Sequence, residues 1–278
     1  KLGNKLEVIV GANFRRYALN SEGSLFALQD NGDEFTISEY GAYAQLKKSM
    51  MDDKLTVTAS ARYDKQSVLE SGNFTPRLGF LFNLSENQNI RLTAQTGFRN
   101  PTNQDKFIGL NQRSFFIVGN EKSSIGRFNT GVVGLVNGQP GSFEGNDIMN
   151  NSVNQVKNAD DSWSSADLNF AKPETVSTVE LGYRYNSSGF TFDISGYYNA
   201  YKDKIAGVYV YTPYLDGTYS TVQDAMDNKE YFEFQIDSNI DNDFSAYGLS
   251  FEAIKTLTPS LTANLVYEYN DLDYTPDP

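Results

Sequence analysis

The sequence predicts an all-β protein, more specifically a transmembrane antiparallel up-and-down β-barrel. Two observations carry this prediction. Nine segments alternate apolar and polar residues with the period of two that gives a strand two different faces. The connections between these segments are alternately short and long, which is typical of outer-membrane barrels with tight periplasmic turns and long extracellular loops.

The nine segments are long enough to cross a bilayer as tilted strands, which takes about 9–11 residues. The third segment alternates most regularly. Its apolar residues share one face: Leu55, Val57, Ala59, Ala61 and Tyr63. Its polar residues share the other face: Thr56, Thr58, Ser60, Arg62 and Asp64. The nine predicted strands span residues 6–17, 35–47, 55–64, 76–84, 90–99, 179–185, 190–199, 247–253 and 261–269.

The connections predict which ends of the strands lie together. Short polar turns are expected at one end, at residues 49–53, 85–88, 186–189 and 258–260. Longer connections are expected at the other end, at about 18–34, 65–73, 100–174 and 204–243. A soluble β-sandwich has no reason to keep this alternation, so the pattern favours a membrane barrel.

The two faces of the predicted strands differ in chemistry. Aromatic residues are expected on the apolar face near the long connections, where a membrane interface would lie. They are Tyr17, Tyr40, Tyr63, Phe74, Phe98, Tyr198, Tyr247 and Tyr267. The opposite face carries more charges than a protein core can pair: Arg62, Asp64, Arg77, Arg91, Arg99, Glu180, Arg184, Asp193 and Glu252. A lipid-facing exterior and a polar lumen account for both faces.

Composition excludes several functional classes. The chain has neither cysteine nor histidine, which removes thiol nucleophiles, the Ser-His-Asp arrangement and almost every zinc or iron site built on these ligands. Paired carboxylates for glycoside hydrolysis remain available, but no spacing singles out a pair. We therefore expect neither an enzyme nor a cofactor. The net charge of −12 argues against a nucleic-acid partner, and no apolar run approaches the roughly 18 residues of a membrane helix.

Residues 93–102, where the fifth predicted strand ends, have the sequence TAQTGFRNPT. This segment resembles the signature with which the barrels of TonB-dependent outer-membrane receptors approach a major extracellular loop. Further matching segments follow the order of the family: residues 40–45, 55–64, 172–183 and 192–198. The resemblance covers nearly the whole chain. It implies a barrel of about 22 strands around an N-terminal plug, which takes up a scarce nutrient with energy from an inner-membrane complex.

This resemblance makes residues 1–278 one partial barrel domain. We expect the plug, a TonB box and the closing strand to lie outside it, because the chain opens directly on a strand pattern and stops at 274–278 in what should be a loop. Nine strands is also an odd number for a bacterial barrel. The implied partners are outer-membrane lipid, the plug, the TonB complex through the plug, and a small nutrient ligand. A surface lipoprotein is a further candidate, and the implied location is the outer membrane of a Gram-negative bacterium.

The segment 100–174 is far longer than a structural connection needs, and such loops are usually functional or disordered. It gathers aromatic, amide and basic side chains without catalytic or metal-binding ones. We predict ligand-binding residues at and within it: Arg99, Asn100, Asn111, Arg113, Phe116 and Trp163. Arg99 and Asn100 are expected to anchor its base. A polar loop whose aromatic residues pack on one another is an open alternative.

The segment 212–245 carries eight acidic residues and a single basic residue, Lys229. Calcium binding through Asp237, Asp241 and Asp243 is one interpretation, but their spacing is not that of an EF-hand. A solvated acidic rim is the preferred interpretation. Such a rim disfavours anionic ligands.

The predicted function is that of a receptor component for energised, TonB-linked uptake of a scarce nutrient such as a glycan, a peptide or a metal chelate. Two alternatives stay open: a passive porin, and a soluble β-rich adhesin or carbohydrate-binding module. A plug with a TonB box would be unique to the first hypothesis. An adhesin module would leave the membrane without detergent.

Overall fold

The computed structural model describes residues 6–22, 24–26, 34–122, 134–136, 139–141, 143–215, 218–240 and 243–274. Its largest element is a nine-stranded antiparallel sheet in which each strand pairs with the next barrel strand along the chain. These strands are β1 (Leu6–Leu19), β2 (Phe35–Met50), β3 (Leu55–Gln66), β4 (Asn73–Ser85), β5 (Gln88–Arg99), β11 (Glu174–Ser187), β12 (Phe190–Lys202), β15 (Phe244–Thr258) and β16 (Leu261–Asp273).

All nine predicted strands are confirmed, and each predicted segment lies inside an observed strand. The observed strands are longer because backbone pairing continues past the point where the side-chain alternation fades. In β11, for example, pairing with β5 begins at Glu174, whereas the apolar alternation begins at Val179. The fold class inferred from the sequence, part of an up-and-down antiparallel barrel, is therefore correct.

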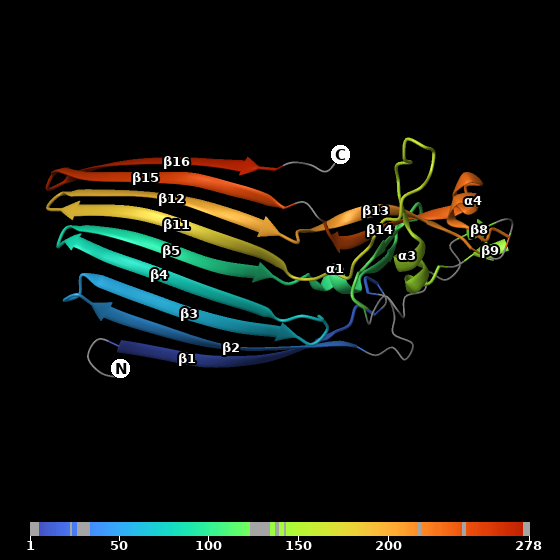
Figure 1. Ribbon diagram of the computed structural model, residues 1–278, viewed down its shortest axis with the longest axis horizontal. Coiled ribbons are helices and arrows are strands. Elements are labelled where there is room, and N and C mark those ends of the chain that lie inside the picture. The colour runs from blue at the N-terminus through green and yellow to red at the C-terminus, as the bar shows by residue number, and fades with distance from the viewer. Residues whose placement is uncertain are drawn as a thin grey trace.

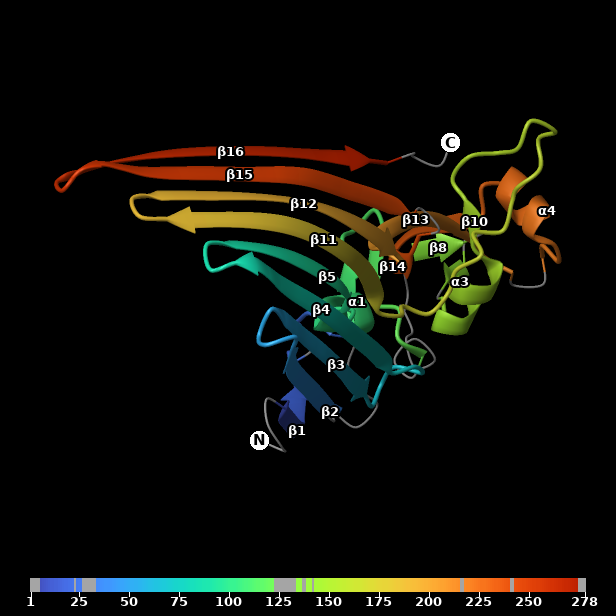
Figure 2. The same cartoon turned by 60° about the vertical axis from the view of Figure 1, so that its left-hand side comes forward.

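The sheet is long and curved, with its short turns at one end and its long connections at the other (Figure 1). The view in Figure 2 shows the curvature across the strands, from β1 to β16. The short turns occupy residues 51–54, 86–87, 188–189 and 259–260. In the third of them, Gly189 has a φ of +76°, a conformation that L side chains rarely adopt. The predicted alternation of short and long connections is confirmed.

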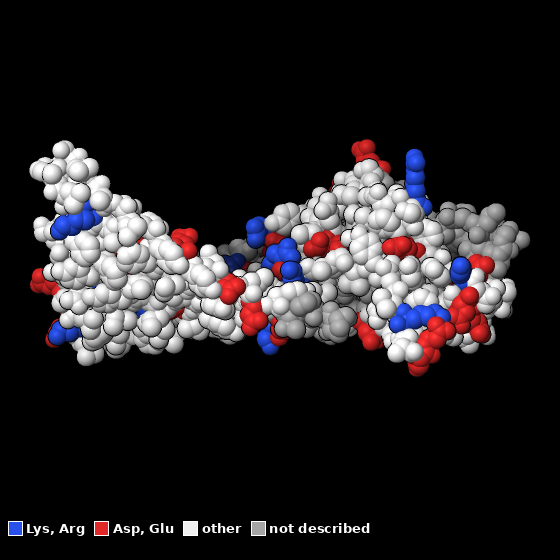
Figure 3. All heavy atoms as spheres, turned by 90° about the horizontal axis from the view of Figure 1, so that it is seen from above, with Lys and Arg blue, Asp and Glu red and all other residues white. Residues whose placement is uncertain are grey.

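One face of the sheet is apolar and exposed, as a lipid-facing surface must be. Seen from above, the surface over the strands is largely free of charge, and charged residues gather in the half that holds the long connections (Figure 3). The apolar face includes Val10, Phe14, Tyr63, Phe74, Val179, Leu181 and Leu249. Seven of the eight predicted interface aromatics lie on it: Tyr40, Tyr63, Phe74, Phe98, Tyr198, Tyr247 and Tyr267.

Tyr17 is the exception, and its placement on the apolar face was wrong. Alternation puts Phe14 and Tyr40 on the apolar face as a cross-strand pair, whereas Tyr17 pairs with Ile37 on the opposite face. The Tyr17 hydroxyl donates a hydrogen bond to the carboxylate of Glu39 there, at 3.4 Å. The residue type of Tyr17 suits an aromatic girdle, but odd-numbered residues of β1 lie on the inner face.

The inner face carries paired charges and tyrosines that lie over glycines. The guanidinium of Arg91 makes two hydrogen bonds to the carboxylate of Asp193, at 2.7 and 3.0 Å, and lies directly over Gly182. A side chain at residue 182 would collide with it, because a Cβ there would lie 2.5 Å from the Arg91 Nε. The polar lumen predicted from the sequence thus includes paired charges, since Arg62 is also paired, with Asp64.

The long connections build a second structure that the sequence analysis missed. A five-stranded sheet has the order β10-β13-β14-β7-β6. Its strands are β6 (Gly109–Asn111), β7 (Phe116–Val118), β10 (Val153–Asn154), β13 (Ile205–Pro213) and β14 (Tyr231–Asn239). Strands β8 (Gly134–Val136) and β9 (Gln139–Gly141) pair with each other, and the helices are α1 (Asn103–Phe107), α3 (Gly145–Asn151) and α4 (Val222–Asp227). None of these three described helices has the length and apolar character needed to cross a membrane.

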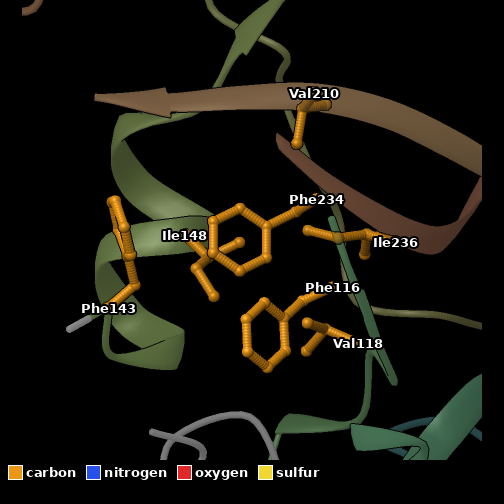
Figure 4. Packing of buried hydrophobic residues seen from close by; sticks show 7 residues of the cluster. All are labelled: Phe116, Val118, Phe143, Ile148, Val210, Phe234 and Ile236. Carbon is orange, nitrogen blue, oxygen red and sulfur yellow. The ribbon is translucent and has the colours of Figure 1, made fainter. Parts of the chain in front are cut away.

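We call the described residues of 100–173 and 203–240 the loop module. They share one hydrophobic core, in which Phe116 stacks on Phe234 with ring centroids 6.0 Å apart and Phe143 meets Phe234 edge-on at 5.3 Å (Figure 4). The core consists of Phe116, Val118, Phe143, Ile148, Val210, Phe234 and Ile236. The described part of the segment 100–174 is therefore packed rather than loose, and it packs against residues of the other long connection.

The interpretation of residues 212–245 as a rim was incomplete. Much of this segment is the paired strand β14 and the helix α4, and alternate residues of β14 enter the core of the loop module. Of the three aspartates considered for calcium, Asp241 lies outside the described residues. Within the described parts of the chain, no group of three or more acidic side chains is placed to hold a metal ion.

Candidate functional site

The base of the loop module is attached to the barrel through Arg99 and Glu174, the last residue of β5 and the first of β11. The Arg99 guanidinium donates two hydrogen bonds to the Glu174 carboxylate, at 2.5 and 2.7 Å. The same carboxylate accepts a hydrogen bond from the backbone N–H of Ile205, at 2.7 Å. One carboxylate thus links three strands. This is an anchoring position for Arg99, as expected from the sequence.

Asn100 lies beside this anchor. Its side-chain oxygen accepts a hydrogen bond from Asn73 at 3.2 Å. It also lines a small pocket of about 170 Å³ together with Asn13, Arg62 and Asp64 of the inner face. Arg99 and Asn100 therefore belong to the junction between barrel and loop module.

Helix α1 lies against the inner face of the barrel at this junction. The Phe107 ring packs on Phe35 of β2 with centroids 4.4 Å apart. The Lys106 ammonium donates a hydrogen bond to the side chain of Gln66 on β3, at 2.8 Å. Lys106 is only 1% exposed, and burial lowers its pKa to about 8. Nothing in the sequence marks this lysine as a buried one.

The hairpin β6–β7 holds three of the predicted ligand-binding residues. The Asn111 side chain accepts a hydrogen bond from the Arg113 backbone N–H at 2.7 Å, and Arg113 has a φ of +72° at the exposed tip. Phe116 is different, because it is 6% exposed and lies in the core. Its neighbour Phe115 points to the other side of the sheet and meets the ring of Tyr209 at 5.9 Å.

The side of the module's sheet that faces away from the core is both aromatic and acidic. Val210 and Phe234 point into the core, so strand alternation places the odd-numbered residues of β13 and β14 on the opposite side. We call this surface the tyrosine face: Gly207, Tyr209, Tyr211, Tyr231, Glu233, Gln235 and Asp237, with Phe115 and Trp163 beside it. The cross-strand pairs on this face are Gly207 with Asp237, Tyr209 with Gln235, and Tyr211 with Glu233.

Trp163 lies at the end of the tyrosine face that is far from the barrel. Its ring meets Tyr211 edge-on at 6.2 Å, and Tyr211 in turn contacts Tyr231 at 4.5 Å. The Lys157 ammonium lies 5.3 Å from the centroid of the indole and pairs with Asp227 of α4 at 3.1 Å. The only tryptophan of the chain is therefore part of an aromatic cluster at the outer end of this face.

The opposite end of the tyrosine face meets α1. Strand β14 contacts this helix, and Asp237 lies near Asp105. Burial, and to a lesser degree the charge of Asp105, raises the pKa of Asp237. The face therefore runs along β14 from the aromatic cluster to the inner wall of the barrel, over about 20 Å for the six residue steps from Tyr231 to Asp237.

A cleft of about 480 Å³ lies at the rim, between the loop module and the barrel. Its walls come from the β3–β4 turn, residues 169–173, Asp203 and Asn239. The ammonium of Lys172 pairs with the Asp203 carboxylate at 2.7 Å within it. Lys172, Asp203 and Asn239 of its lining are held by one another, so we regard the cleft as part of the junction between module and barrel rather than as the candidate site.

The structure thus divides the six predicted residues between several places. Arg99 and Asn100 lie at the base, Asn111 and Arg113 at a hairpin tip, Trp163 on the tyrosine face and Phe116 in the core. Sequence reasoning missed the residues of β13 and β14, because it treated their segment by its charge. The sequence does contain a signal for strand β14, because the apolar residues Phe232, Phe234 and Ile236 alternate with the polar residues Glu233 and Gln235.

Comparison with known proteins agrees with this architecture. The family model described as "TonB dependent receptor-like, beta-barrel" matches residues 1–277. No curated protein has significant sequence similarity to the chain. Similar solved structures include the siderophore receptor PirA from Pseudomonas aeruginosa, with 16% identity and a TM-score of 0.57 over 97% of this chain and 38% of that one.

Two further solved structures are similar. The FrpB iron transporter from Neisseria meningitidis has 14% identity and a TM-score of 0.55, over 99% of this chain and 34% of that one. A variant of the ferric enterobactin receptor PfeA from Pseudomonas aeruginosa has 17% identity and a TM-score of 0.56, over 96% and 33%. At these identities the likeness concerns the fold. The chain spans roughly a third of the length of these neighbours.

Part of an outer-membrane β-barrel accounts for the apolar exterior, the charged inner face and the alternating connections. The family match agrees with this architecture. Receptors of this family are located in the outer membrane of Gram-negative bacteria. The chain belongs to the TonB-dependent receptor family and forms part of its outer-membrane β-barrel.

Proposed function

We propose that this chain is the barrel and loop portion of a receptor that takes up a scarce nutrient across the outer membrane with energy delivered through TonB. The nutrient is a glycan, a peptide or a metal chelate. The observation that supports this proposal best is the loop module. Two long connections fold around one core and place a continuous face of ring, amide and carboxyl groups between the outer tip and the inner barrel wall.

The partners are part of the same proposal. A plug domain inside the complete barrel would receive the ligand from the loop module and would contact the TonB complex. A surface lipoprotein that covers the loop module is a further candidate partner. The family consists of transport receptors, and we expect no catalytic activity from this chain. The structural neighbours named for siderophores and iron make a metal chelate one of the ligand classes to test.

The test uses the full-length receptor in cells. We would compare uptake of labelled ferric enterobactin, a labelled neutral oligosaccharide and a labelled peptide in cells with and without a functional TonB complex. We expect TonB-dependent uptake of at least one of them. Phe234→Asp should abolish that uptake while the barrel remains in the membrane, because a carboxylate without a partner would replace a ring at the centre of the module's core. Uptake that does not depend on TonB would refute the proposal.

A further inference from the structure

We propose that the tyrosine face is a track for a neutral oligosaccharide, which leads from the outer aromatic cluster to the mouth of the barrel. This inference rests on the proposed uptake function and names its substrate class. The face is about 20 Å long along β14, so it suits an extended, repetitive ligand better than a compact one. Its ring and hydrogen-bonding groups recur along that length.

The aromatic residues supply platforms along the track. Tyr209 is 46% exposed, in the middle of the face, and Phe115 lies beside it at 5.9 Å. Tyr211, Tyr231 and Trp163 form the outer cluster. A pyranose ring presents a flat patch of C–H groups, which stacks on the negatively charged face of an aromatic ring. The two groups of rings give the track two stacking positions along its length.

The polar groups between the rings suit hydroxyl ligands, because they both donate and accept hydrogen bonds. The Gln235 amide lies over Gly207, where a Cβ would be only 2.4 Å from its Nε2 atom. A Cβ at residue 207 would displace the amide, so the glycine lets it lie beside Tyr209, the cross-strand partner of Gln235. Tyrosine hydroxyls add further groups of the same kind, and burial raises the pKa of Tyr211, so its phenol stays protonated.

The charges of the track argue against an anionic ligand. Glu233 and Asp237 lie on it, and Asp105 lies at its inner end. A polyanionic chelate would approach three carboxyl groups, and the repulsion would weaken binding. A basic peptide is a poorer fit than a sugar, because Glu233 already accepts a hydrogen bond from Gln155 at 3.0 Å.

The experiment measures binding to the full-length receptor in detergent by calorimetry. The probes are neutral oligosaccharides of glucose, mannose and xylose in increasing lengths, an oligogalacturonate, an oligolysine peptide and ferric enterobactin. We expect at least one neutral series to bind, with affinity rising until the ligand spans the track. Tyr209→Ala should weaken binding at least tenfold, and Tyr209→Phe by less, because the ring remains.

Tyr274→Ala is the matched control. Tyr274 is 44% exposed and follows β16, where its ring meets Phe244 of β15 outside the tyrosine face, so its removal should leave affinity unchanged. Equal amounts of each variant in the outer membrane would show that folding is intact. The inference is overturned if no neutral oligosaccharide binds, if the peptide or the chelate binds in its place, or if Tyr209→Ala behaves like the control.

The two proposals fail separately. If ferric enterobactin or the peptide is imported in a TonB-dependent way and Tyr209→Ala has no effect, the proposed uptake function is supported and the saccharide track is refuted. If an oligosaccharide binds in a Tyr209-dependent way but its uptake is unchanged without TonB, the saccharide track is supported and energised uptake is refuted.

Discussion

The side chain of Asn239 forms hydrogen bonds with both backbone groups of Lys172. Its Oδ1 atom accepts from the Lys172 N–H at 2.8 Å, and its Nδ2 atom donates to the Lys172 carbonyl at 3.0 Å. The same amide nitrogen donates to the carbonyl of Asp203 at 2.5 Å. One side chain at the end of β14 thus joins the segment before β11 to the bend between β12 and β13, and it fixes the loop module on the barrel.

Asn239→Ala should loosen the loop module without unfolding the barrel. The substitution leaves three backbone partners without this amide, at a cost of about 1–3 kcal/mol. Limited proteolysis of the full-length receptor should cut β13 and β14 faster, while the barrel strands stay protected. Asn158→Ala is a control, because the side chain of Asn158 is exposed and bonds within its own turn, to Ser162 and Ser164, rather than to the junction. Equal cleavage rates for both variants would contradict the role of Asn239.

Lys106 predicts a pH dependence of helix α1. Its pKa in the folded module is about 8, below the ordinary value of 10.5, so the unfolded segment binds the proton more tightly. Docking of α1 should therefore become more stable as pH rises from about 8 to about 10.5, by an amount on the order of 3 kcal/mol, and should be weakest below pH 8.

Lys106→Met removes the titrating group and should abolish this gain. Thermal unfolding of the loop module, followed by the fluorescence of Trp163, measures the effect at neutral and at alkaline pH. A module that loses stability between pH 8 and 10.5, or a Met variant with the same pH profile as the parent, would show that Lys106 is not responsible.

Leu92→Arg should block assembly of the barrel, and the adjacent Thr93→Arg should be mild. Leu92 lies on the lipid-facing side, where an arginine at mid-membrane costs about 2–4 kcal/mol. Thr93 points to the lumen and pairs across strands with Glu180, which can accept the new charge. Heat-modifiable electrophoresis of outer membranes measures assembly. Equal defects in the two variants would refute the assignment of the faces.

Gly119→Ala should disrupt the contact between β7 and α1. A Cβ at residue 119 would lie 2.4 Å from the backbone of Lys106 and Phe107, and backbone atoms cannot move aside as a flexible side chain can. A loss of about 1–3 kcal/mol is expected for the module. Gly79→Ala is the matched control, because its nearest neighbours lie at 3.9 Å. Chemical denaturation of the two variants compares them directly.

Removal of one long connection should damage the other. Excising residues 104–171 would expose Val210, Phe234 and Ile236, which pack against that segment. We expect the single deletion to be prone to aggregation and rapid degradation. Joint removal of residues 104–171 and 206–238 should restore a well-behaved barrel that binds no ligand. Levels of each deletion in the outer membrane check this expectation.

The barrel could be predicted from the sequence because lipid and lumen impose a simple rule on every strand. The alternation of Leu55, Val57 and Ala59 with Thr56 and Thr58 directly reflects two different solvents. Tyr17 shows that residue type alone does not predict the face of a strand. It is an aromatic residue near the long-connection end of its strand, where a membrane interface would lie, but it lies on the inner face. Parity, and not residue type, decides the face.

The loop module was harder to predict because its contacts join distant segments. The pairing of Phe116 with Phe234 belongs to a parallel contact between β7 and β14, for which no local pattern exists. Phe116 was expected to bind ligand because aromatic loop residues often do. In the structure it packs in the core of the loop module instead. Trp163 was singled out for the same reason and lies on an accessible face. Residue type alone did not separate the two.

The parallel contact between β7 and β14 also sets an order of assembly. The membrane strands β11 and β12 lie between these two segments in the chain, so β7 can pair with β14 only once both ends of the β11–β12 hairpin lie on the same side of the membrane. Contacts of such long sequence separation form slowly. We therefore expect the core of the loop module to close late in folding, after the β11–β12 hairpin has formed, which couples the folding of the module to that of the barrel.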